Sequence, residues 1–149
     1  MDILKNLQIA LGLKENVIDP TANPQQSQNK ILIVEDELLL SNALELKFKH
    51  NNFSVFKAMN GQIGLEMAQS NKPDIILLDL MMPVMDGKEM LHKLRELPDF
   101  KYLPVVVLTN AGDVENMKQT KMYDNASAFL IKSNVNPDEI LQVVNDLLK

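Results

Sequence analysis

Polar residues follow four apolar segments of this 149-residue chain, each at the point where the segment ends. Glu35 and Asp36 follow ILIV, Asp79 follows IILL, Thr109 follows VVVL and Lys132 follows AFLI. The carboxyl ends of parallel strands meet at one edge of a sheet, where ligands bind, so these side chains are expected to lie together. Neighbouring carboxylates repel each other, and a hard cation such as Mg²⁺ relieves that repulsion. The hydroxyl and the ammonium suit a phosphoryl group, and Asp79 could accept it as a nucleophile.

From residue 30 onward, apolar strand patterns alternate with helical patterns. The expected strands cover 31–34, 53–58, 74–79, 104–109 and 127–132, and helices are expected over 37–50, 60–70 and 86–97, and after Asp113 and Asn136. Several strands are apolar throughout, which indicates that helices cover both of their faces. The pattern predicts an α/β fold: a doubly wound, five-stranded parallel sheet with helices on both faces.

Residues 1–29 differ in pattern from the rest of the chain. Ile3, Leu4, Leu7 and Leu11 stand at helical spacing and predict a short amphipathic helix. The segment after it contains prolines and many amides, which is typical of a linker. We therefore expect an N-terminal extension over 1–29 and one domain over 30–149. The helix is either a loosely docked extension or a docking and self-association helix, and the sequence leaves both open.

Composition excludes several classes of protein. The net charge is −5 and no dense cluster of Lys and Arg occurs, which disfavours direct nucleic-acid binding. No apolar run approaches the roughly 18 residues that a membrane span needs, so no membrane association is expected. The absence of cysteine excludes disulfides and thiolate metal sites and fits a cytoplasmic location.

The motifs at the strand ends resemble, in order and spacing, those of the response-regulator receiver domain, the chemotaxis-regulator-like phospho-acceptor module of two-component signalling. They are VED at 34–36, LLDLMMPVMDG at 77–87, LT at 108–109 and the LIK that ends at 132. The resemblance covers roughly 120 residues and leaves out the first 29. It implies a flavodoxin-like strand order, 2-1-3-4-5.

Carried over by position, the resemblance assigns a role to each strand-end residue. Asp79 would accept a phosphoryl group from a histidine kinase or phosphotransfer protein, and Lys132 would hold a phosphoryl oxygen. Mg²⁺ would be bound by Glu35, Asp36, Asp79 and the backbone carbonyl of Met81.

The resemblance also implies a switch. Thr109 would turn toward the phosphoryl group while Phe129 moves inward, and this would alter a face for a downstream protein or for a homodimer formed on phosphorylation. Phe129 as a plain core residue remains the alternative, because it lacks the hydroxyl that many relatives carry.

Two departures from the family pattern and two apolar residues concern the site. Ser133 stands where a proline usually follows the lysine, so the Lys132–Ser133 peptide bond is either trans with a shifted loop, or cis and held by its surroundings. Asn110 is larger than the small residue that usually follows the threonine. It either narrows access to the phosphoryl group or donates a hydrogen bond of its own. Met81 and Ala111 occupy positions that, in the family, tune the attack of water on the phosphoryl group. Both are apolar here and cannot orient a water molecule, which predicts an aspartyl phosphate that decays over minutes to hours.

Two other functions compete with a phosphorylated switch. One is an interaction module of the same fold that works without phosphorylation, although the intact set of acids argues against it. The other is a small phosphatase, for which Met81 stands where a general acid is needed, so no enzymatic turnover beyond self-phosphorylation and autodephosphorylation is expected.

The chain ends at Lys149, just after the last predicted helix. It is therefore expected to be a stand-alone receiver or a fragment of a longer protein.

Overall fold

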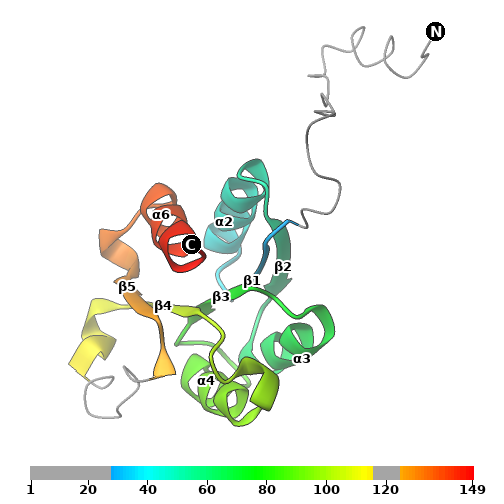
Figure 1. The fold of residues 1–149 in the computed structure, drawn as a ribbon. Helices are drawn as coiled ribbons and strands as arrows, with labels where there is room; N and C mark the ends of the chain where they lie inside the picture. The colour runs from blue at the N-terminus through cyan, green and yellow to red at the C-terminus, as the bar shows by residue number, and fades with distance from the viewer. Residues whose placement is uncertain (1–27, 116–124) are drawn as a thin grey trace, which may run out of the picture.

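The computed structural model describes residues 28–115 and 125–149. The strands are β1 (Lys30–Val34), β2 (Ser54–Ala58), β3 (Ile75–Asp79), β4 (Val105–Thr109) and β5 (Ala128–Ile131) (Figure 1). The helices are α2 (Leu38–His50), α3 (Gly61–Asn71), α4 (Gly87–Glu96) and α6 (Pro137–Leu147), with short 3₁₀ turns η1 (Pro98–Phe100), η2 (Ala111–Asp113) and η4 (Lys132–Asn134). The helix expected near the N-terminus, and residues 116–124 of the one expected after Asp113, lie outside the described residues. Within the described ranges, no helix has both the length and the apolar character that a membrane span requires.

The five strands form one parallel sheet in the order β2-β1-β3-β4-β5, which confirms the predicted fold class and strand order. Val34 pairs with Leu78 across β1 and β3, and Thr109 pairs with Ile131 across β4 and β5. The residues that follow these positions therefore emerge at the same edge of the sheet.

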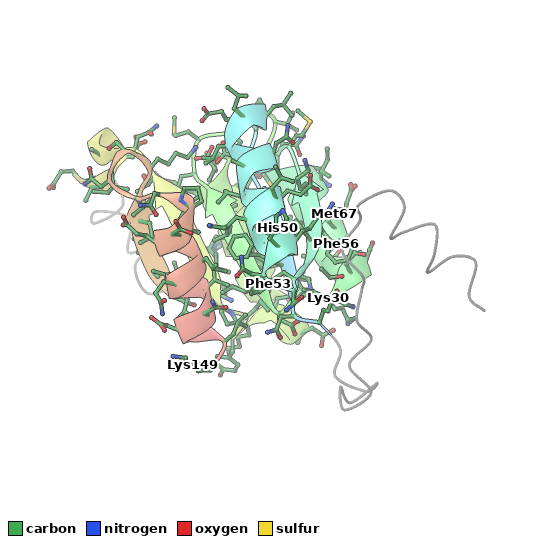
Figure 2. All side chains as sticks on the ribbon, turned by 90° about the horizontal axis from the view of Figure 1, so that it is seen from above. Lys30, His50, Phe53, Phe56, Met67 and Lys149 are labelled. Carbon is green, nitrogen blue, oxygen red and sulfur yellow. The ribbon has the colours of Figure 1, made fainter. Side chains whose placement is uncertain are left out.

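Helices cover both faces of the sheet, α2 and α6 on one and α3 and α4 on the other (Figure 1). Figure 2 shows α2 and α6 side by side over their face, and the two helices are in contact. Ile31 and Ile33 point into the core on the side of α2 and α6, while Leu32 and Val34 point into the core on the other side. All four are buried, which explains why the central strands are apolar at every position.

Three helices begin with side-chain caps. Asn60, Asp86 and Asn136 each accept a hydrogen bond of 2.9 Å from the backbone N–H three residues later. Such bonds satisfy backbone donors that a helix start leaves free. They fix where each helix begins after the loops at the carboxyl edge of the sheet.

Candidate functional site

Three carboxylates meet at the carboxyl edge of the sheet. Asp79 is the last residue of β3, and Glu35 and Asp36 directly follow β1, its neighbour. Each side chain offers an oxygen, and these three oxygens lie within 4.8 Å of one another. Glu35 and Asp79 are buried, whereas Asp36 is exposed. The pairing of β1 with β3 therefore produces the acid cluster that the sequence predicts.

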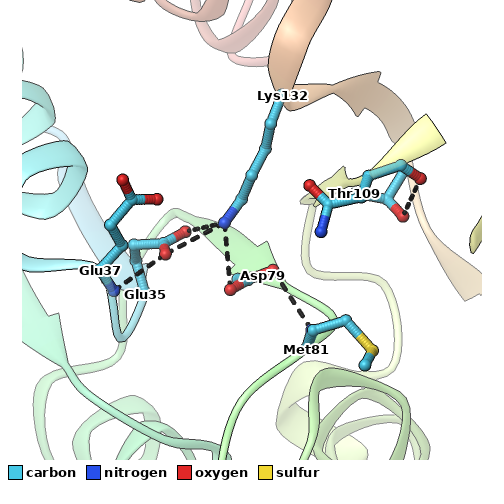
Figure 3. Close-up of polar contacts among 7 residues, drawn as sticks. Glu35, Glu37, Asp79, Met81, Thr109 and Lys132 are labelled. Carbon is cyan, nitrogen blue, oxygen red and sulfur yellow. Dashed lines mark hydrogen bonds and ion pairs between the residues drawn. The ribbon is translucent and has the colours of Figure 1, made fainter. Parts of the chain in front are cut away.

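Lys132 directly follows β5, and its side chain reaches the same cluster. Its Nζ lies 3.1 Å from Oδ2 of Asp79, and 2.9 and 3.1 Å from Oε2 and Oε1 of Glu35 (Figure 3). The ammonium is mostly buried, with 17% of the side chain exposed. One cation is thus shared between two buried carboxylates that come from different strands.

Burial and charge shift the pKa of each buried group. Desolvation raises the pKa of Glu35, the charge of Asp79 adds to this rise, and the hydrogen bond from Lys132 only partly opposes it. Desolvation likewise raises the pKa of Asp79, against the attraction of Lys132 and with a contribution from the charge of Asp36. Burial alone would lower the pKa of Lys132, but the hydrogen bond to Glu35 and the charges of both acids raise it. Burial therefore disfavours the charge on both acids, and Lys132 only partly offsets this effect.

Backbone N–H groups also donate hydrogen bonds to the two buried carboxylates. Asp79 Oδ1 accepts a hydrogen bond of 3.2 Å from the backbone N–H of Met81, and Glu35 Oε1 accepts one of 3.1 Å from that of Glu37. Among the described side chains, Glu35 Oε2 is the buried polar atom that accepts no hydrogen bond, although the ammonium of Lys132 lies close to it. The clustered carboxylate oxygens of Glu35, Asp36 and Asp79 fit a hard divalent cation of the Mg²⁺ type.

Thr109 ends β4 at the edge that carries the acid cluster, and Phe129 lies within β5, opposite Val107. Thr109 is buried, and its hydroxyl donates a 3.3 Å hydrogen bond to the backbone carbonyl of Asn110. Figure 3 marks this hydrogen bond with a dashed line beside Thr109. Phe129 is half-buried and packs against the core that lies beneath α3 and α4. The structure thus brings Thr109 to the predicted edge with its hydroxyl bonded elsewhere.

Backbone contacts of the β3–α4 loop hold Asp79 in place, and sequence reasoning did not assign them. Gly87 N–H donates to the carbonyl of Leu80 at 2.9 Å, and a Cβ on Gly87 would stand 2.3 Å from the backbone oxygen of Asp79. Gly61 N–H donates to the carbonyl of Met85 at 2.9 Å, which ties the loop to the start of α3. The signal in the sequence was the Asp-Gly pair that ends the loop motif.

The Lys132–Ser133 peptide bond is trans, since the described residues contain no cis peptide bond. It lies in the 3₁₀ turn η4, which follows β5 directly. Of the two predicted alternatives, the trans form is the one observed.

Comparison with known proteins identifies the family. The model of the response regulator receiver domain matches residues 31–145. The chain belongs to the response regulator receiver family. This confirms the resemblance seen in the sequence, and makes the protein a receiver domain of two-component signalling, in which phosphorylation of an aspartate is typical.

The relatives of this receiver domain agree with the assignment. It is 35% identical over 121 residues to the transcriptional regulatory protein SrrA of Staphylococcus aureus, which covers 81% of the chain and 48% of SrrA. A putative response regulator from Chloroflexus aurantiacus is 29% identical with a TM-score of 0.73, over 81% of this chain and 98% of that one. The chemotaxis response regulator CheY4 of Vibrio cholerae is 27% identical with a TM-score of 0.73, over 81% and 99%. The receiver chain spans about half the length of the curated relatives it matches.

Proposed function

We propose that Asp79 is the phospho-acceptor of this receiver domain. A carboxylate oxygen of Asp79 would attack the phosphorus of a phosphohistidine, the P–N bond would break, and the freed imidazole would leave with its electron pair. The observation that carries the proposal is the position of Asp79: it lies among two further acids and the ammonium of Lys132 at the carboxyl edge of the sheet. Phosphoryl transfer depends mainly on positioning and charge stabilisation, which this arrangement supplies.

The same acids form the proposed metal site. Glu35, Asp36 and Asp79, with the backbone carbonyl of Met81, would hold Mg²⁺, which when bound neutralises charge on the acids and the phosphoryl oxygens. Lys132 would keep its contact with this edge and bind a phosphoryl oxygen as a point charge. The three carboxylate oxygens that lie within 4.8 Å of one another support a cation here.

Thr109 and Phe129 form the proposed switch. The hydroxyl of Thr109 now donates to the carbonyl of Asn110 and would exchange that bond for one to a phosphoryl oxygen. Phe129 would follow into the space that opens on the side of α4. Because phosphorylation stabilises one of two existing arrangements, the switch shifts a population.

We place the domain in a cytoplasmic relay. A histidine kinase or phosphotransfer protein would donate the phosphoryl group, and a downstream protein, or a second copy of the chain, would bind the altered face. Turnover of free phosphate esters is not part of this proposal, because the side chain two residues after Asp79 is the thioether of Met81, which cannot act as a general acid.

The experiment is phosphorylation with acetyl phosphate and Mg²⁺, followed by intact-mass measurement. We expect the wild type to gain one phosphoryl group and Asp79→Asn to gain none. Asp99→Asn is the matched control, since Asp99 is an exposed acid that pairs with Lys72 far from the cluster, and it should be modified like the wild type. Beryllofluoride with Mg²⁺ should shift the NMR resonances of Thr109 and Phe129. Loss of modification in the control, or its persistence in Asp79→Asn, would remove Asp79 as the acceptor.

A further inference from the structure

Helix α2 presents an apolar stripe on the side that faces away from the sheet. Its buried side carries Leu44 and Phe48, which are fully buried in the core. On the opposite side Leu39 is 83% exposed and Leu46 is 60% exposed, and the exposed Ala43 lies between them. These three residues, at positions i, i+4 and i+7, share one side of the helix and form what we call the outer stripe.

The outer stripe distinguishes α2 from the helices α4 and α6. A surface helix normally turns polar residues to solvent. In α4 and α6 every exposed position is polar or charged, whereas α2 exposes Leu38 as well as the two leucines of the outer stripe. Contiguous exposed apolar groups of this kind indicate a contact surface.

We propose that the N-terminal segment of this same chain, residues 3–11, packs on the outer stripe. Leu4, Leu7 and Leu11 span seven residues at helical spacing, as Leu39 and Leu46 do. At 1.5 Å per residue, both sets of side chains extend over about 10 Å along a helix axis. A shared seven-residue apolar spacing is what two helices packed side by side require.

The tether between the two surfaces is long enough for this contact. Residues 12–29 link the segment to Lys30, where β1 begins, and α2 packs against both β1 and β2. A flexible chain of this length has a root-mean-square span of roughly 24 Å. Helix α2, with 13 residues, is about 20 Å long, so the whole outer stripe lies within reach.

The small size of the stripe favours this occupant over a second copy of the chain. A stable interface between separate proteins buries about 1,200 Å² or more, far beyond what two leucines and an alanine offer. A tethered segment meets its surface at an effective concentration in the millimolar range, so a small contact suffices. The contact does not depend on the chemistry of Asp79 and stands apart from the proposed phosphorylation.

The test uses the absence of native cysteine from the chain. Leu46→Cys is introduced into the full chain, and its rate of alkylation by iodoacetamide is measured with and without Leu7→Glu. We expect Leu7→Glu to raise this rate about tenfold, because the charge releases the segment and opens access to the thiol. Lys93→Cys, on the exposed side of α4 across the sheet, is the matched control, and its rate should not respond to Leu7→Glu.

A second measurement identifies the occupant. The double variant Leu7→Cys with Leu46→Cys should form a disulfide within one chain under mild oxidation, at a yield that does not change on dilution. The pair Leu7→Cys with Lys93→Cys should not. Equal alkylation rates with and without Leu7→Glu would overturn the proposal. A crosslink that joins two chains and disappears on dilution would also overturn it, and would assign the outer stripe to a second copy.

Discussion

Replacing Asp79 by asparagine should stabilise the protein when no divalent cation is present. Asp79 lies within 4.8 Å of both Glu35 and Asp36, and 3.1 Å from the ammonium of Lys132. With an effective dielectric constant of about 20, each repulsion is at least about 3.5 kcal/mol and the attraction is about 5 kcal/mol. Asp36 is exposed, so solvent screens its repulsion and the opposing charge interactions nearly cancel, which leaves burial of the Asp79 charge as the largest cost. We expect Asp79→Asn to raise the free energy of unfolding by about 2 kcal/mol at neutral pH.

The pH dependence follows from the raised pKa of Asp79. The stability that this group contributes is fully present below its ordinary pKa of 3.8, and is lost as the pH rises through the higher pKa of the folded state. The wild type and Asp79→Asn should therefore converge near pH 3.8 and separate toward neutral pH. Saturating Mg²⁺ should reduce the difference in the free energy of unfolding between the two proteins. The wild type keeps all three acids, so the cation stabilises it more strongly than it stabilises Asp79→Asn.

Urea denaturation in EDTA and in Mg²⁺, at several pH values, measures these differences. Asp99→Asn serves as the control, since Asp99 forms an exposed ion pair with Lys72 and its loss should change little. An Asp79→Asn variant that is less stable than the wild type in EDTA at neutral pH would refute the reasoning. It would show that the pair with Lys132 outweighs the repulsion among the acids.

Four further outcomes are expected. Gly87→Ala should destabilise the protein by about 3 kcal/mol, because the new Cβ would stand 2.3 Å from a backbone oxygen. Gly112→Ala is the control and should not destabilise it, because nothing lies within 4 Å of its Cβ. Equal melting temperatures of the two variants would contradict this. Val84→Gly should raise the free energy of unfolding by up to about 1 kcal/mol, because Val84 has a φ of 69° in the left-handed region; a loss in urea titration would argue against strain there. Arg95→Met should cost about 2 kcal/mol in thermal unfolding, since its guanidinium donates four hydrogen bonds to backbone carbonyls, and an unchanged melting curve would disprove that contribution. The aspartyl phosphate should persist for minutes to hours in a quench time course, and decay within seconds would show that the apolar Met81 does not slow attack by water.

The candidate site was predictable because strand-end residues obey a local rule. Glu35, Asp36, Asp79 and Lys132 each follow an apolar run, and in a parallel sheet such positions share one edge. The structure brings all of them together, and it shows Thr109 at the same edge. The direction of the Thr109 hydroxyl was not predictable, because a side-chain torsion responds to neighbours that the sequence does not place.

The sequence by itself determined the alternation of strands and helices and the family, because these depend on residue types at short spacing. Tertiary structure alone decided that Lys132 pairs with Glu35 as well as with Asp79, a contact between residues 97 positions apart. It also decided that Gly87 must approach the backbone of Asp79, and that α2 leaves three leucines exposed. These features depend on the order and register of the whole sheet, which set distances between segments that no local pattern records.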